Sequence, residues 1–211
     1  MIKLFDPENK FWNFLSKITD VFCISILWVI CSLPVFTFGA ATGALYSFTL
    51  HQVYDAEDSV FHGFFTAFRN SFKKATVVWG IQLGLGLFLT LDCFLAWQYF
   101  IRSKNVLAII VLAVVGCITL MYIMASSYLY PLLVTFDFSI KKLVMDSLIM
   151  SVANLFYTVA ILLIWAVAAV MVYFFSGIFF VFVGLAAFFS SYFIRAVFLK
   201  YTVDAAEKNS L

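Results

Sequence analysis

The chain has 211 residues, of which 65% are apolar and only 11% are charged, and its mean hydropathy is +1.07. A water-soluble domain cannot keep so much apolar surface from water, so this composition predicts a protein that crosses a membrane several times. Uninterrupted apolar runs such as 160–175 exclude a β-barrel, whose strands alternate apolar and polar residues. The sequence therefore predicts an all-α membrane bundle that forms one transmembrane domain over residues 1–211.

The N-terminal part of the chain is predicted to form a surface helix followed by a helical hairpin. Residues 1–20 carry apolar side chains at helical spacing, which is typical of an amphipathic helix on the membrane surface; the polar start of the first span is an equally good interpretation. Pro34 removes a backbone donor and should interrupt the first span, and Gly39 then begins a short second span. Residues 21–54 are therefore expected to form a tight antiparallel hairpin.

Small residues recur every fourth position in two of the predicted spans. Such a strip lets another helix approach closely, and in lipid it is packing that drives the association of helices. The strips and the nearby proline are expected to be the helix-packing positions of the chain. These positions are Pro34, Gly39, Gly43, Ser47, Gly80 and Gly84.

Two amphipathic segments, 58–74 and 138–155, lie between the predicted hairpins. The first carries phenylalanines at spacings of three and four and ends in cations, a pattern typical of an interfacial helix, although ordinary packing also explains an aromatic stripe. Both segments are expected on the cytoplasmic side, where a partner can contact them. The expected contact residues are Phe64, Phe68, Arg69, Lys73, Lys74, Lys141 and Lys142.

The remaining apolar runs predict two further hairpins, at 75–136 and 156–200, and residues 201–211 read as a short cytoplasmic tail. Pro131, near the end of the second hairpin, is expected to break its last helix early. Together with the first hairpin, these runs give six transmembrane helices.

The distribution of cations predicts the orientation of these six helices. With the N-terminus inside, eleven of the thirteen Lys and Arg residues lie at the cytoplasmic side, and only Arg102 and Lys104 lie outside. Both termini are then cytoplasmic, Arg195 reaches the cytoplasmic headgroups, and the break at Pro34 lies at or near the outer face. This orientation suits a multi-pass membrane protein with nearly all of its non-membrane surface on the cytoplasmic side.

Residues suited to catalysis or to metal binding are scarce. Asp92 is the one carboxylate deep in a predicted span, which suggests either proton-coupled transport or a structural role near the outer surface. His51 and His62 match no metal motif, and the four cysteines lack the spacing of a metal or disulfide site. The sequence therefore predicts no enzyme activity, no catalytic residues, no metal and no cofactor.

Several short motifs resemble one family. They are LW at 27–28, CSLPV at 31–35, GA at 39–40, ALY at 44–46, FF at 64–65, AFR at 67–69 and FKKA at 72–75. In these motifs the chain resembles the YesL-type family of bacterial membrane proteins of unknown function, over roughly residues 5–200. Members are often encoded beside carbohydrate importers of the ATP-binding cassette (ABC) class, especially in Firmicutes. The resemblance implies an accessory subunit of such an importer and provides no catalytic residues.

Two main functional hypotheses follow. The first is a non-enzymatic accessory or regulatory subunit that binds the importer permease within the membrane and contacts the cytoplasmic side, including the ATPase. The alternative is an independent small transporter or channel, with homo-oligomers formed through the glycine faces. It would need a polar path, for which the available side chains are Thr37, Thr42, Gln82, Asp92 and Asn154. The lipid bilayer is a partner in both hypotheses, and nucleic acid in neither.

Overall fold

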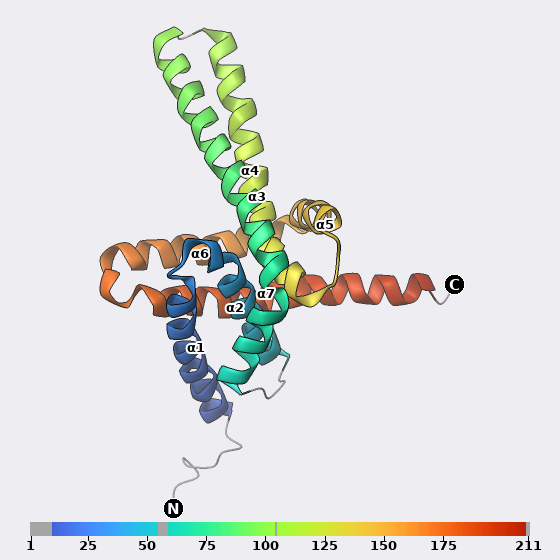
Figure 1. Ribbon diagram of the computed structural model, residues 1–211. Helices are drawn as coiled ribbons and strands as arrows, with labels where there is room; N and C mark the ends of the chain where they lie inside the picture. The colour runs from blue at the N-terminus through green and yellow to red at the C-terminus, as the bar shows by residue number, and fades with distance from the viewer. Residues whose placement is uncertain (1–9, 55–58, 104, 210–211) are drawn as a thin grey trace, which may run out of the picture.

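The computed structural model describes residues 10–54, 59–103 and 105–209, and all regular structure within them is helical (Figure 1). The elements are α1 (Lys10–Ser32), η2 (Val35–Thr37), α2 (Phe38–Val53), α3 (Val60–Ser103), α4 (Val106–Thr135), α5 (Ile140–Ala153), α6 (Leu155–Phe174), η3 (Ser176–Ile178) and α7 (Phe179–Asn209). No strand occurs in these described residues. The predicted all-α class is therefore confirmed.

Four of the described helices are long and apolar enough to cross a membrane, namely α3, α4, α6 and the Phe179–Tyr201 part of α7. This finding supports the predicted membrane character. Helix α2 is different, because it has 16 residues, rises about 24 Å, and buries most of its side chains among the other helices. It is thus a core helix of the protein, and the six-span arrangement stays a prediction.

The turn between α1 and α2 forms around Pro34. Helix α1 ends at Ser32, and a short 3-10 turn leads to the start of α2. The hydroxyl of Thr37 lies 2.6 Å from the carbonyl oxygens of both Cys31 and Pro34, and so holds the turn closed. The predicted break at Pro34 and the hairpin over 21–54 thus correspond to α1, η2 and α2.

Helix α3 is one uninterrupted helix of 44 residues. At about 1.5 Å per residue it rises about 66 Å, twice the thickness of a bilayer's hydrocarbon core. The expected division between an interfacial segment at 58–74 and a span from 75 is not marked by any break in the helix. The first half of α3 packs antiparallel to α2, whereas the second half packs against α4, and the two form a hairpin that projects beyond the rest of the chain (Figure 1).

Pro131 does not break α4, so the expectation of an early end is wrong. The helix continues to Thr135, with Pro131 inside it. The residues around the proline, from 128 to 133, are all buried. Proline inside a helix removes one backbone donor and crowds the carbonyl four residues before it, and here the burial of the surrounding side chains keeps the last turn helical.

Helices α6 and α7 form the third hairpin, which runs across α3 and α4 (Figure 1). They are joined by the short η3 turn, and α7 continues to Asn209, through most of the predicted tail. Helix α7 also contacts α1 and α2. The core therefore lies around α2, which α1, α3, α4 and α7 all contact.

Candidate interaction surfaces

The small residues of α2 face the inside of the protein. A Cβ atom added to Gly39 would lie 2.6 Å from the carbonyl oxygen of Ala75 and 2.6 Å from the Cβ of Trp79, so only glycine permits this approach of α2 to α3. At Gly43 the nearest atom would be a methyl group of Val134, 3.4 Å away. This face of α2 is occupied by α3 and α4 and is not available to a partner.

Gly80 and Gly84 have the same spacing as Gly39 and Gly43 but a different environment. Both are exposed, and a Cβ atom at either would meet no atom of the described chain within 4 Å. Nothing described in this chain packs on them. Their predicted packing role therefore requires lipid or another chain.

Two other glycines, which the spacing of small residues did not indicate, do permit close contacts. A Cβ atom on Gly184 of α7 would overlap the Ser25 hydroxyl of α1. A Cβ atom on Gly86 would lie 2.8 Å from the Tyr122 hydroxyl, which donates a hydrogen bond to the Gln82 carbonyl oxygen at 2.8 Å. Gly184 stands alone in an apolar run, and Gly86, two residues after Gly84, falls outside the four-residue spacing that singled out Gly80 and Gly84.

The proposed cytoplasmic contact residues divide into core and surface groups. Phe64 is 0% exposed and its ring stacks on that of Phe68, so Phe64 belongs to the core and cannot contact a partner. The reason is that Phe64, Phe68 and Phe72 pack in or against the core, whereas Phe61 and Phe65 of the same segment are exposed. Arg69 and Lys73, on the opposite side of α3, remain exposed.

A cluster of charged and aromatic side chains lies where α4 passes into α5, and we call it the basic junction: Lys74, Asp137, Phe138 and Lys142. The Lys74 ammonium lies 2.7 Å from the Asp137 carboxylate, and that of Lys142 lies 4.1 Å from the centre of the Phe138 ring. The hydrogen bond and charge of Lys74 lower the pKa of Asp137. Lys141 is exposed beside the junction, so this end of α4 is positively charged.

Arg195 makes contacts within the protein that the sequence did not indicate. Its guanidinium donates a hydrogen bond to the Val53 carbonyl oxygen at 2.8 Å and lies 4.8 Å from the centre of the Tyr54 ring, and its expected contact with the headgroups stays a prediction. Lys17 donates to the neighbouring Gln52 carbonyl oxygen at 3.0 Å. Two cations thus bind the C-terminal carbonyl groups of α2, where the helix dipole is negative.

Polar side chains that the sequence analysis did not single out hold α2 against the third hairpin. Thr49 and Ser191 lie 2.9 Å apart between their hydroxyl oxygens, and the Trp165 indole donates to the Tyr46 hydroxyl at 3.3 Å. All of these atoms are within the protein core or at its edge. Polar groups surrounded by apolar ones require such partners, and here the partners join distant segments.

The side chains considered for a polar path lie apart. Gln82 accepts a hydrogen bond from Tyr130 at 2.8 Å, Thr37 closes the first turn, and Asn154 donates to Tyr201 at 3.2 Å at the other end of the core. Asp92 is half-buried on α3 and has no hydrogen bond or ion pair with any described residue. The geometry therefore does not bring these candidates together.

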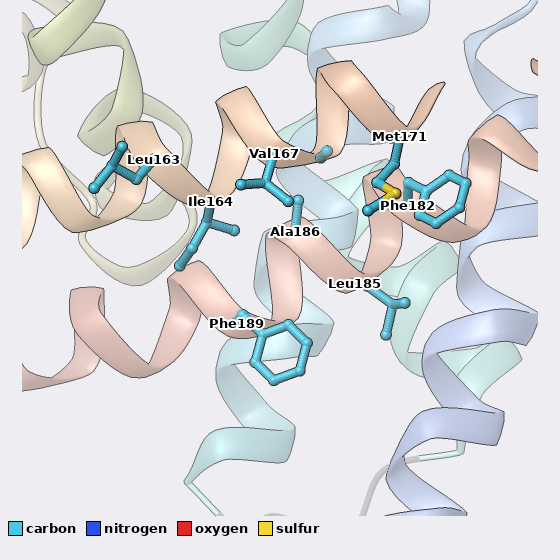
Figure 2. Close-up of a pocket in the computed structure, with 9 residues that line it drawn as sticks. Leu163, Ile164, Val167, Met171, Phe182, Leu185, Ala186 and Phe189 are labelled. Atoms are coloured by element: carbon cyan, nitrogen blue, oxygen red, sulfur yellow. The ribbon is translucent and has the colours of Figure 1, made fainter. Parts of the chain in front are cut away.

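Two pockets lined by described residues differ in the polarity of their linings. One, of about 320 Å³, lies beside the basic junction and includes Ser47, Asn70, Ser71 and Lys74. The other, of about 350 Å³, is a groove between α6 and α7 (Figure 2). Its lining is wholly apolar and suits a hydrocarbon chain: Leu163, Ile164, Val167, Ala168, Met171, Phe182, Leu185, Ala186 and Phe189.

Among the described residues, no three His, Cys, Asp or Glu side chains come together in a metal-binding arrangement. The cysteines in that part of the chain are free thiols. The expectation that the protein is not an enzyme stays a prediction, because the geometry of these surfaces does not test for a reaction.

Comparison with known proteins adds a family match. A family model described as a protein of unknown function, DUF624, matches residues 21–93, which cover the second half of α1, all of α2 and most of α3. No curated protein and no solved structure matches the chain. The match covers the region where the motifs are densest, and it carries no activity with it.

Proposed function

We propose that the chain is a non-enzymatic accessory or regulatory subunit of a carbohydrate importer of the ABC class, in a bacterial cytoplasmic membrane. The observation that carries this proposal is the division of its surfaces. Polar side chains of the core hold its own helices together, while the long faces of α3, α4 and α6 are apolar and exposed. Such faces are suited to contacts with lipid and membrane proteins.

The proposed subunit would meet its partners at two levels. The apolar helices would contact the permease within the membrane, and Arg69, Lys73 and Lys141 would contact the permease or its ATPase from the cytoplasm. Both termini would be cytoplasmic in this arrangement. The six-span topology predicted by the sequence satisfies these conditions, and so does any arrangement with an even number of crossings.

The test is purification of the tagged protein from its native membranes in a mild detergent, followed by identification of the chains that accompany it. Recovery of a permease or ATPase supports the proposal. The double substitution Arg69→Glu with Lys73→Glu should reduce that recovery at least severalfold, whereas Lys200→Glu, an exposed change on α7, should not. Recovery of the chain without any importer subunit, while other complexes survive, would contradict the proposal.

The alternative, an independent transporter or channel, is favoured by one observation: Asp92 lies in a candidate span and has no polar partner among the described residues. It predicts flux in proteoliposomes that contain this chain alone, and loss of that flux on Asp92→Asn. Absence of flux for a range of sugars and ions, with the protein correctly inserted, would leave the accessory role as the proposal.

A further inference from the structure

The α3–α4 hairpin has charged ends and an almost uncharged middle. Between Lys74 and Arg102, helix α3 carries a single charged residue, Asp92, and α4 carries none from 106 to 135. Asn105 and Arg102 lie at the tip of the hairpin, and the basic junction lies at its base. The hairpin is thus a long apolar segment between two polar ends.

The spacing of these features along α3 matches the layers of a bilayer. At about 1.5 Å per residue, Trp79 and Trp97 are separated by about 27 Å, close to the thickness of roughly 30 Å for a hydrocarbon core. By the same measure Lys74 and Arg102 are separated by about 42 Å, within the roughly 40–45 Å of a bilayer with its headgroups. Tryptophan is enriched at both membrane interfaces, so two independent features give the same register.

The exposure of the hairpin indicates what surrounds it. The less exposed residues of α4 recur at spacings of three and four, at 108, 112, 115, 119 and 122, and they face α3. The other side chains of α4 between 106 and 121 are exposed in every direction. A partner protein covers one face of a helix pair, whereas lipid covers all faces, so hydrocarbon is the environment that this hairpin fits.

The tip of the α1–α2 hairpin lies at the base of this segment. The indole of Trp79 donates a hydrogen bond to the Val35 carbonyl oxygen at 2.8 Å. From there α2 runs back along the first half of α3, since Gly39 lies against Ala75 and Gly43 lies near Ser71. The α1–α2 hairpin and the second half of α3 therefore occupy successive levels along α3, and one bilayer cannot contain both.

Side chains at the tip of the α1–α2 hairpin are apolar and exposed. Leu33, Val35 and Phe36 are 75%, 69% and 60% exposed, at the level of Trp79. Apolar side chains at an interface enter the boundary between headgroups and acyl chains. A hairpin tip of this kind suits contact with a bilayer surface.

We infer that a lipid bilayer surrounds the α3–α4 hairpin from Trp79 to Trp97, and that the α1–α2 hairpin stays on the side of the basic junction with its tip at the bilayer surface. Phosphate groups of the lipids face Lys74 and Lys142 on that side. The six-span topology differs, because it places the Pro34 turn at the outer face together with the 102–105 loop.

The test uses single cysteines in a chain whose four native cysteines are replaced by alanine. In intact cells and in inverted vesicles, a membrane-impermeant maleimide should label Val35→Cys and Asn105→Cys from opposite sides. Leu91→Cys, at a side chain that is 62% exposed in the protein, should be protected from both sides. Labelling of positions 35 and 105 from the same side, or of position 91 from either side in intact membranes, would overturn the inference.

Two further variants guard against a misfolded chain. Phe36→Cys replaces a second exposed tip residue and must give the same side as position 35, and Lys200→Cys on α7 should label from the cytoplasmic side. The inference rests on the membrane location in the proposed function but not on the importer. A failed purification of importer subunits would leave the labelling pattern unchanged, so the two failures can be distinguished.

Discussion

Glycines that share the same four-residue spacing have different structural roles in this chain. Gly39 permits direct contact between two helices, whereas Gly80 faces away from the described chain. Spacing along one helix identifies a smooth face but not the neighbour that covers it. The sequence could therefore indicate the close approach at Gly39, could not distinguish it from Gly80, and could not indicate Gly184.

This difference predicts opposite results for the same substitution. Gly39→Ala should lower the free energy of unfolding in detergent by about 1–3 kcal/mol, because the new methyl group meets the Ala75 carbonyl and Trp79. Gly80→Ala is the matched control and should leave stability unchanged or raise it slightly, since alanine favours helix by about 1 kcal/mol. Thermal unfolding of the two variants measures this, and equal losses would contradict the assignment of Gly39 to the α2–α3 contact.

The ion pair between Lys74 and Asp137 predicts a dependence on pH. Lys74 lowers the pKa of Asp137 from its ordinary value of 3.8. The pair therefore stabilises the fold above that value, and its contribution is lost as pH falls through the lowered pKa. The wild-type chain should unfold at a higher temperature than Asp137→Asn at neutral pH, and this gap should close in strong acid and shrink in high salt. A gap that widens in acid would show that the pair is not its source.

At the scale of elements, the apolar runs of the sequence predicted the positions of most of the helices. The predicted hairpins at 75–136 and 156–200 correspond to α3 with α4 and to α6 with α7. The predicted change from an amphipathic segment to a span is not marked by a break in α3, because nothing between Lys74 and Ala75 interrupts a helix, even though the polarity of the sequence changes there. The effect of Pro131 was overestimated because the burial that keeps α4 helical depends on tertiary neighbours.

The contact between α1 and α7 includes one closely packed pair of small residues, Ser25 and Gly184. Gly184→Ala should destabilise the protein, since its methyl group overlaps the Ser25 hydroxyl and lies 3.0 Å from the Ser25 Cβ and 3.2 Å from the Val21 carbonyl oxygen. Adding Ser25→Gly should restore part of the loss, because it removes the first two contacts. A double-mutant cycle of unfolding free energies measures the coupling. Additive effects of the two changes would show that the residues do not meet.

At the scale of the whole molecule, the sequence reveals which helices are apolar but not which of them share one bilayer. The hydropathy of one apolar run contains no information about its position relative to the other runs. The relative levels of the hairpins follow from contacts such as Trp79 with Val35, which join segments far apart in the chain. This is why the membrane class could be predicted from composition, whereas the side of the membrane on which the Pro34 turn lies could not.

The proposed register predicts that a charge has different effects at two positions of the same helix. Leu91→Arg lies within the hydrocarbon and should cost about 2.5–3.5 kcal/mol of insertion free energy. Phe61→Arg is the matched control: Phe61 is 63% exposed, close to the 62% of Leu91, but lies on the first half of α3 outside the bilayer. The fraction of protein that resists alkaline extraction from membranes should fall for the first variant only. Equal fractions would contradict the register.

The polar contacts of α2 set the order in which the protein can be completed. Its Tyr46, Thr49 and Val53 bind groups of α7 that follow them by 142 to 144 residues. During synthesis α2 is therefore made long before α7, and its contacts with α7 form only after the intervening helices have been synthesised. Helix α7 completes the centre of the fold, so a chain that stops before α7 lacks these contacts with α2.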